Sequence, residues 1–292
     1  MMRLWRWWVA RCSAMTDPLP LALTRVLVCA TIVLDLLRGW ALGLSPWLWR
    51  TFDDGGLSTF QGERAFIDDL DPAHGGLVTM WIVIGALTSA ALGVATRPMM
   101  GVGLVAYAQL GHLYPPGDRA IDRLLRTVLL ILLFSGAHQR LSLVRWWKQA
   151  APIAQIRRWP VDLIVFILVL VYTSAGLHKV FSTLGWIGPI GLPPVYRIVT
   201  DPMVGYLQPD RWAWAMPLFR LGGMFTILIE CSAFLLWTRW KPYWALGGAA
   251  LHLGIAMTMV LGMFSWGMLA LYPLLFAPWI VDRFGRNTAS TM

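Results

Sequence analysis

Long apolar stretches recur along the whole 292-residue chain, and they constrain its fold more than any other feature. About 20 apolar residues in a row can cross a bilayer as a helix, and lipid accepts only helices and closed barrels as spanning structures. Apolar residues make up 58% of the chain. Charged residues make up 13%, which is about half the charged fraction of a soluble domain. We therefore expect an all-α, single-domain helical bundle embedded in a membrane.

The apolar stretches predict about eight membrane-spanning helices. They cover residues 21–44, 77–95, 99–114, 121–137, 160–181, 219–238, 243–261 and 264–281. The third and fourth stretches are short, so tilted, re-entrant or buried helices remain alternatives there. We expect the transmembrane domain to occupy residues 20–282, preceded by a basic, tryptophan-rich segment at 1–19 and followed by a cytoplasmic tail at 283–292.

Basic and acidic residues alternate between the loops of this predicted bundle. The loops on the side of the termini carry Arg3, Arg6, Arg11, Arg97, Arg140, Arg145, Lys148, Arg157, Arg158, Arg239, Lys241, Arg283 and Arg286. Basic loops face the cytoplasm, so both termini are expected there, in a multi-pass protein of the cell (inner or plasma) membrane. The long acidic loops at 45–76 and 182–218 are expected outside. Because the positive charge follows topology and forms no single patch, we expect membrane lipid as a partner and no nucleic acid.

The first candidate for chemistry is Lys179, near the outer end of the predicted helix 160–181. A lysine within a spanning helix is energetically costly and is a functional candidate for that reason. Ala175 and Gly176 lie about one turn below Lys179 on the same helix face, where they leave room for a neighbouring helix or a ligand. An alternative interpretation, that the side chain simply extends to the lipid headgroups, is about equally supported.

Few other polar side chains fall inside the predicted spans. They are Arg25, Asp35, Asp122, Arg126, His178, Glu230 and His252. Asp122 and Arg126 are spaced i, i+4, and Asp35 and Arg38 i, i+3, so each couple is expected to pair along one helix face, most simply as structural ion pairs. A single intramembrane histidine such as His252 more often bonds to a neighbouring helix than to a ligand. If Lys179, Glu230 and His252 converge, however, they would form a proton-handling site.

Other kinds of site are not indicated. The five histidines have no HxH, HxxxH or HExxH spacing, so no metal is expected, and no nucleotide-binding loop or GxSxG element is present. The three cysteines have no CxxC spacing and are interpreted as small apolar residues. Most of the 18 tryptophans are expected to form belts at the membrane interfaces. Trp186 and Trp266 are candidates to face a planar ligand near Lys179.

Several stretches, in order, are similar to one known family. AGLHKVFSTLGWIG at 175–188 resembles the AG-x-x-K…W-x-x-G element of vitamin K-dependent γ-glutamyl carboxylase and its bacterial relatives, the HTTM (horizontally transferred transmembrane) domain family. LALTRVLVCATIVLDLL with FDDGG, HLYPPGDRAIDRLLRTVLLILLF and LIECSAFLLW resemble its other helices. The most specific similarity is ALHLGIAMTMVLGMFSWGMLALYPLLF. Together they cover about residues 20–282.

The resemblance implies a membrane enzyme of the lyase or oxidoreductase type that acts with a reduced, vitamin K-like quinone at the extracytoplasmic face. Lys179 corresponds to the lysine that deprotonates the quinol, and the chemistry ends in carboxylation of a glutamate in a secreted peptide. His252 likewise corresponds by position to a histidine of the family's later helix. With its neighbour His178 added, the candidate catalytic residues are Lys179, His178 and His252. The candidate cofactor-binding residues are Trp186, Trp266, Glu230, Asp122 and Arg126.

A lysine that acts as a base must be able to lose its proton, and a free lysine with its pKa of about 10.4 is almost wholly charged at pH 7. The hypothesis therefore requires Lys179 to be buried among apolar groups without a tightly paired carboxylate such as Glu230. Arginine could not replace such a base, because it does not surrender its proton. The alternative hypothesis is a non-catalytic membrane factor that matures or exports a secreted peptide together with partner proteins.

Overall fold

The computed structural model describes residues 2–50, 52–53, 55–58, 74–151, 153–182, 186 and 193–281. It confirms the all-α class, since β1 (Met15–Thr16) and β2 (Ile156–Arg157) are the only strands in these ranges. The acidic residues expected at 59–73, together with Asp54, Gly188 and the tail 283–292, lie outside the described residues. The chain divides into two compact units, the first comprising 1–161 with 277–292 and the second 162–276.

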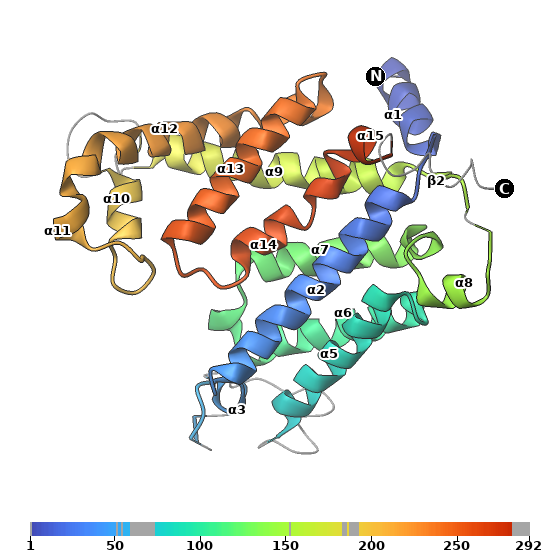
Figure 1. Ribbon diagram of the computed structural model, residues 1–292, viewed down its shortest axis with the longest axis horizontal. Coiled ribbons are helices and arrows are strands. Elements are labelled where there is room, and N and C mark those ends of the chain that lie inside the picture. The colour runs from blue at the N-terminus through green and yellow to red at the C-terminus, as the bar shows by residue number, and fades with distance from the viewer. Residues whose placement is uncertain are drawn as a thin grey trace. The chain divides into compact units, whose positions relative to one another are not determined.

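The first unit is built from helices of very different lengths (Figure 1). They are α1 (Met2–Ser13), α2 (Leu19–Ala41), α3 (Ser45–Leu48), α5 (Gly75–Leu92), α6 (Thr96–Leu113), η1 (Pro115–Gly117), α7 (Ala120–Phe134), η2 (Ala137–Gln139), α8 (Leu143–Trp147) and α15 (Ala277–Ile280). Helix α9 (Trp159–Phe181) starts in this unit and continues into the second. The rest of the second unit comprises α10 (Pro194–Val199), α11 (Pro209–Trp212), η3 (Ala213–Ala215), α12 (Met216–Cys231), η4 (Ala233–Trp237), α13 (Lys241–Thr258), α14 (Phe264–Leu269) and η5 (Tyr272–Leu274).

Four helical segments in the described part of the chain are long and apolar enough to cross a membrane. They are Leu19–Ala41, Gly75–Leu92, Trp159–Phe181 and Pro209–Cys231. The full set of eight spans is not confirmed. Helix α7 has 15 residues, or about 22 Å at 1.5 Å per residue, which is short of the hydrocarbon thickness. The stretch expected as the last span is divided into α14, η5 and α15, because Pro273 and Pro278 fall inside it and cannot continue a helix.

Helices α5 and α6 form the closest helix pair of the first unit, joined by a tight turn (Figure 1). Gly93 ends α5 with a φ of 78°, in the left-handed region that glycine adopts without strain. Further along the pair, Gly103 of α6 faces α5, where a Cβ would lie only 2.4 Å from the Leu87 side chain. The absence of a side chain therefore allows the two helices to approach closely.

Arg25 in the N-terminal third of α2 is completely buried, and its partners are backbone carbonyls. Its Nη1 donates to Ala137 O at 2.8 Å, and its Nη2 donates to Ala91 O at 3.2 Å and to Leu141 O at 2.5 Å. Ala91 lies in the last turn of α5, where carbonyls lack partners within the helix and attract a cation. One guanidinium thus holds α2, the end of α5 and the segment after α7 together.

Two further contacts hold segments together at one end of the first unit. Strand β1 pairs antiparallel with β2, with Met15 opposite Arg157. Ser142 Oγ donates to Gly93 O at 2.8 Å. The residues before α2, the turn after α5 and the segment between α7 and α9 therefore share one end, in agreement with the expectation that these basic segments lie on one side.

Replacing Arg25 by methionine is expected to destabilise the first unit strongly. The variant leaves buried carbonyls without donors, and each such group costs about 1–3 kcal/mol. We therefore expect a loss of at least about 3 kcal/mol in unfolding free energy, measured by thermal unfolding in detergent. Arg38→Met is the matched control, because Arg38 lies in the same helix and is exposed. Equal melting temperatures for the two variants would contradict this account of Arg25.

Candidate functional site

Lys179, near the end of α9, forms an ion pair with Glu230, near the end of α12. Its Nζ lies 2.7 Å from both Oε1 and Oε2 of Glu230. The two side chains are 20% and 10% exposed, respectively, so the pair is largely enclosed by protein and still reachable. Lys179 is therefore directed at a neighbouring helix, and the interpretation that it merely extends to the lipid headgroups is not supported.

Gly176 explains why the two helices come close enough for this pair to form. A Cβ at Gly176 would lie 2.8 Å from Cys231 Sγ and 2.9 Å from Glu230 Cβ, closer than real side chains approach. Figure 1 shows α12 running alongside α9. The small residues below Lys179 were expected to admit a helix or a ligand, and the structure shows that Gly176 admits α12.

Trp186 is the aromatic partner of Lys179. The Nζ atom lies 5.4 Å from the centroid of the Trp186 ring, within the range of a cation–π interaction. The Trp186 ring also lies against α12, since its Cε3 would be 3.8 Å from a Cβ at Gly223, an ordinary contact distance. The indole and the Glu230 carboxylate both stabilise an ammonium ion. The requirement for a lysine without a tightly paired carboxylate is therefore not met here.

His252 of α13 belongs to a buried network of aromatic side chains. Its Nε2 lies 2.6 Å from Tyr172 Oη of α9, and that hydroxyl lies 3.0 Å from Tyr272 Oη of η5. His252 is 3% exposed, and within the described residues its Nδ1 has no hydrogen-bond partner. The histidine thus bonds to neighbouring helices, the commoner role for an intramembrane histidine.

Trp244 connects this network to the Lys179–Glu230 pair. Its ring packs edge-on against Tyr172 at 4.9 Å between centroids, and its Nε1 donates to Ile229 O at 2.9 Å, next to Glu230. Tyr172 precedes Lys179 by seven residues, so the two side chains occupy the same face of α9, two turns apart. We did not single out Tyr172 from the sequence, although its position on the face that carries Lys179 could have indicated it.

Two predicted site residues are not part of this cluster. His178 follows Leu177 on the exposed side of α9 and is itself exposed. Trp266 lies on α14 with 48% of its surface exposed. In the part of the chain that the structure describes, the ring in contact with Lys179 is that of Trp186.

Asp122 and Arg126 lie in the first unit, and the ion pair expected between them is wrong. Asp122 binds Arg119 through Nε and Nη2, each at 2.9 Å, and accepts a hydrogen bond from Tyr107 Oη at 2.7 Å. Arg126 binds Asp118 at 2.7 Å. Arg119 precedes the first turn of α7 and donates its backbone N–H to Asp122, so this helix cap takes the carboxylate that spacing alone would assign to Arg126.

The pairing expected between Asp35 and Arg38 is also wrong. Asp35 binds Arg119, and Arg38 is exposed. Burial of the Asp118 carboxyl opposes its ionisation, but hydrogen bonds from Arg126 and Arg123 outweigh that effect and lower its pKa. The cluster joins α2, α7 and the turn between α6 and α7, an arrangement that agrees with the structural role favoured for these charges.

Within the described residues, no group of histidine, cysteine or acidic side chains is placed to hold a metal ion. The arrangement that can carry chemistry is the Lys179–Glu230 pair with Trp186 beside it. It combines a proton acceptor, a fixed positive charge and an aromatic ring, all near the end of an apolar helix. That combination suits proton transfer from a neutral, weakly acidic ligand.

A family model described as the HTTM domain matches residues 120–279, more than half of the chain. The matched range contains Tyr172, Lys179, Glu230 and His252. Comparison with curated proteins found no match, and comparison with solved structures found none either.

Proposed function

The chain belongs to the HTTM domain family, and from that premise we propose that it is a membrane enzyme whose Lys179–Glu230 pair removes a proton from a membrane-soluble substrate. The observation that carries the proposal is the contact itself, with Nζ at 2.7 Å from both carboxylate oxygens. A pair of opposite charges near the end of a membrane helix is costly to desolvate, and well-packed apolar residues would often be as stable. Such a pair is therefore a functional candidate.

In this proposal Glu230 accepts the proton, and Lys179 stabilises the charge that remains. One Oε of Glu230 takes the proton from a substrate hydroxyl and becomes part of a neutral carboxylic acid. The Lys179 ammonium, released from the carboxylate, then faces the negative substrate oxygen. One proton moves and the net charge of the site is unchanged, so no new charge must be created in an apolar environment. This role differs from a lysine base, since the amine keeps its proton throughout.

A reduced quinone, the cofactor implied by the carboxylase resemblance, fits the residues present. When bound, it would supply a weakly acidic hydroxyl on a planar ring that reacts with oxygen. Glu230 and Lys179 would bind the hydroxyl, and the Trp186 ring, already positioned beside Lys179, would contact the planar ring. His252 would act through Tyr172 to position α9, without touching the ligand. A secreted peptide remains the proposed final substrate.

Lys179→Met and Glu230→Gln are each expected to lower quinol-dependent turnover at least about 100-fold, the lower end of what general acid–base groups contribute. Lys179→Arg is expected to keep a measurable fraction of turnover, because arginine retains the positive charge. The measurement is oxygen consumption by the purified protein in nanodiscs supplied with a reduced naphthoquinone. Ser174→Ala, an exposed change less than two turns away on α9, is the control and should leave turnover unchanged.

Three outcomes would contradict this assignment. An inactive but folded Lys179→Arg would indicate that the lysine itself must lose a proton. A Lys179→Met, Glu230→Leu double variant with normal turnover would show that the pair only packs α9 against α12. If the wild-type protein shows no turnover and no quinone is found by mass spectrometry of its co-purified lipids, the non-catalytic maturation or export factor becomes the better hypothesis.

The proposed orientation places both termini in the cytoplasm, and the gathering of basic segments at one end of the first unit supports it. A cysteine at Phe52, which is 75% exposed, should react with an impermeant reagent added to intact cells, whereas one at Trp147, 85% exposed, should not. Gly56 is unsuitable as a labelling position, because a Cβ there would lie 2.1 Å from Arg50 O. Labelling of Trp147→Cys alone would reverse the proposed topology.

A further inference from the structure

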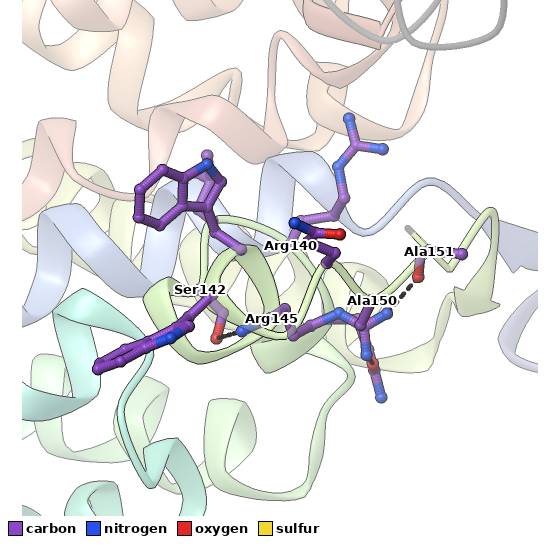
Figure 2. Close-up of a pocket in the computed structure, with 10 residues that line it drawn as sticks. Arg140, Ser142, Arg145, Ala150 and Ala151 are labelled. Atoms are coloured by element: carbon purple, nitrogen blue, oxygen red, sulfur yellow. Dashed lines mark hydrogen bonds between the residues drawn. The ribbon is translucent and has the colours of Figure 1, made fainter. Parts of the chain in front are cut away.

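An open groove with a volume of about 970 Å³ lies on the segment 139–151, between α7 and β2 (Figure 2). Its lining combines two arginines, Arg140 and Arg145, with Trp146 and Trp147, and includes no acidic residue. It is separate from the Lys179–Glu230 pair, which lies in the second unit. The residue types at the groove are those that bind an anionic group next to an apolar surface.

Arg145 fixes the shape of the groove. Its Nη1 donates to Gln139 Oε1 at 3.2 Å, and its Nη2 donates to the carbonyl of Ala151. Figure 2 shows Arg145 extending from the turn near Ser142 toward Ala151. The guanidinium therefore ties together the two ends of the segment 139–151, each six residues from Arg145.

Two lining residues are held in a strained backbone conformation. Leu141 has a φ of 51° and Gln149 a φ of 48°, in the left-handed region that residues other than glycine rarely adopt. They flank α8 on either side, and the Leu141 carbonyl is bound by the buried Arg25. Strain of this kind persists only where surrounding contacts enforce it, and it is concentrated at ligand-binding segments.

Arg140 provides the available charge. Its backbone carbonyl accepts a hydrogen bond from Arg25 at 3.4 Å, but among the described residues its guanidinium forms neither a hydrogen bond nor an ion pair. An arginine fork can bind two oxygens of a phosphate at once. Arg145, by contrast, is already engaged by Gln139 and Ala151.

The surroundings place this groove at the level of the lipid headgroups. Trp146 and Trp147 are 80% and 85% exposed, and tryptophan concentrates at membrane–water interfaces. The β1–β2 pairing holds the chain after the groove segment next to the end of α1. Helix α1 carries further arginines, and its Trp5 and Trp7 are also exposed. Two helices long and apolar enough to span a membrane, α2 and α9, begin beside these strands.

We propose that this groove binds the phosphate headgroup of an anionic phospholipid, with Arg140 as the principal phosphate contact and Trp146 and Trp147 seated in the interface beside it. The site is a built groove on the membrane surface of the protein, distinct from a diffuse attraction of basic loops to an anionic leaflet. It does not depend on the proposed proton chemistry.

The test is a lipid titration of the purified, detergent-solubilised full chain, followed by thermal unfolding. Dihexanoyl phosphatidylglycerol is compared with dihexanoyl phosphatidylcholine and with inorganic phosphate. The wild type is expected to be stabilised by phosphatidylglycerol only. Arg140→Gln should weaken the apparent affinity about fivefold, as expected for the loss of one basic contact with an anionic lipid surface. Arg140→Lys should retain part of the affinity, because lysine keeps the charge but cannot bind two phosphate oxygens as a fork.

Lys148→Gln is the matched control, because Lys148 directly follows α8, is exposed and does not line the groove. The proposal requires its affinity to equal that of the wild type. Equal weakening in Arg140→Gln and Lys148→Gln would show a diffuse electrostatic effect and would overturn the groove as a site. Stabilisation by inorganic phosphate at the same concentration would overturn the assignment to a lipid. No preference for phosphatidylglycerol over phosphatidylcholine in the wild type would overturn both.

Discussion

Charged side chains inside apolar helices must find partners within the protein, and this constraint organises both units. In the first unit the two terminal nitrogens of Arg25 donate to carbonyls at the end of α5 and after α7, which fixes three segments at once. At the other end of α2, Asp35 is bound by Arg119 from the start of α7. In the second unit Lys179 is satisfied by Glu230, which brings α9 and α12 together. Each buried charge thus specifies a contact between segments distant in sequence.

The Lys179–Glu230 pair differs from the others in its composition and surroundings. Arg25 is completely enclosed, and its partners are backbone groups that cannot accept a transferable proton. Glu230 can accept a proton, and Lys179 is one-fifth exposed beside the Trp186 ring. Lys179 also lies 20 residues after Trp159, about 30 Å along α9, the thickness of the hydrocarbon core. A helix of this length that crosses the bilayer would carry the pair to the membrane face opposite to its start.

Composition and periodicity predicted the helical class and identified the face of α9 that carries Gly176 and Lys179, because both depend on local sequence. Gly176 below Lys179 was recognised as a place of close approach for the same reason. The partners of the charges could not be obtained in this way. Asp122 and Arg126 have ideal helical spacing, yet they do not pair. Arg119 binds Asp122 and Asp118 binds Arg126, and both of these partners lie just before α7. The outcome depends on where α7 begins, because Arg119 caps the helix and the turn before it carries Asp118 to Arg126, whereas helical spacing considers only residues inside the helix.

The same limit applies to the histidine and to the number of spans. His252 was recognised as an intramembrane polar residue, but its bond to Tyr172 joins residues 80 positions apart. Hydropathy indicated a span at 264–281 because it averages over Pro273 and Pro278, whereas the backbone cannot continue a helix through them. Hydropathy predicts only that such a stretch is buried or contacts lipid. Whether one continuous helix crosses the membrane there depends on the backbone, which prolines interrupt.

The protonation state of Glu230 tests the central claim most directly. The chain contains two glutamates, Glu63 and Glu230, so isotope labelling of glutamate carboxyls gives an infrared spectrum simple enough to assign with Glu230→Gln. Without ligand, we expect a carboxylate band from Glu230. Addition of a reduced naphthoquinone in the absence of oxygen should replace it by a protonated carboxyl band that is missing in Glu230→Gln. A carboxylate band that stays unchanged at saturating quinol would contradict proton transfer to Glu230.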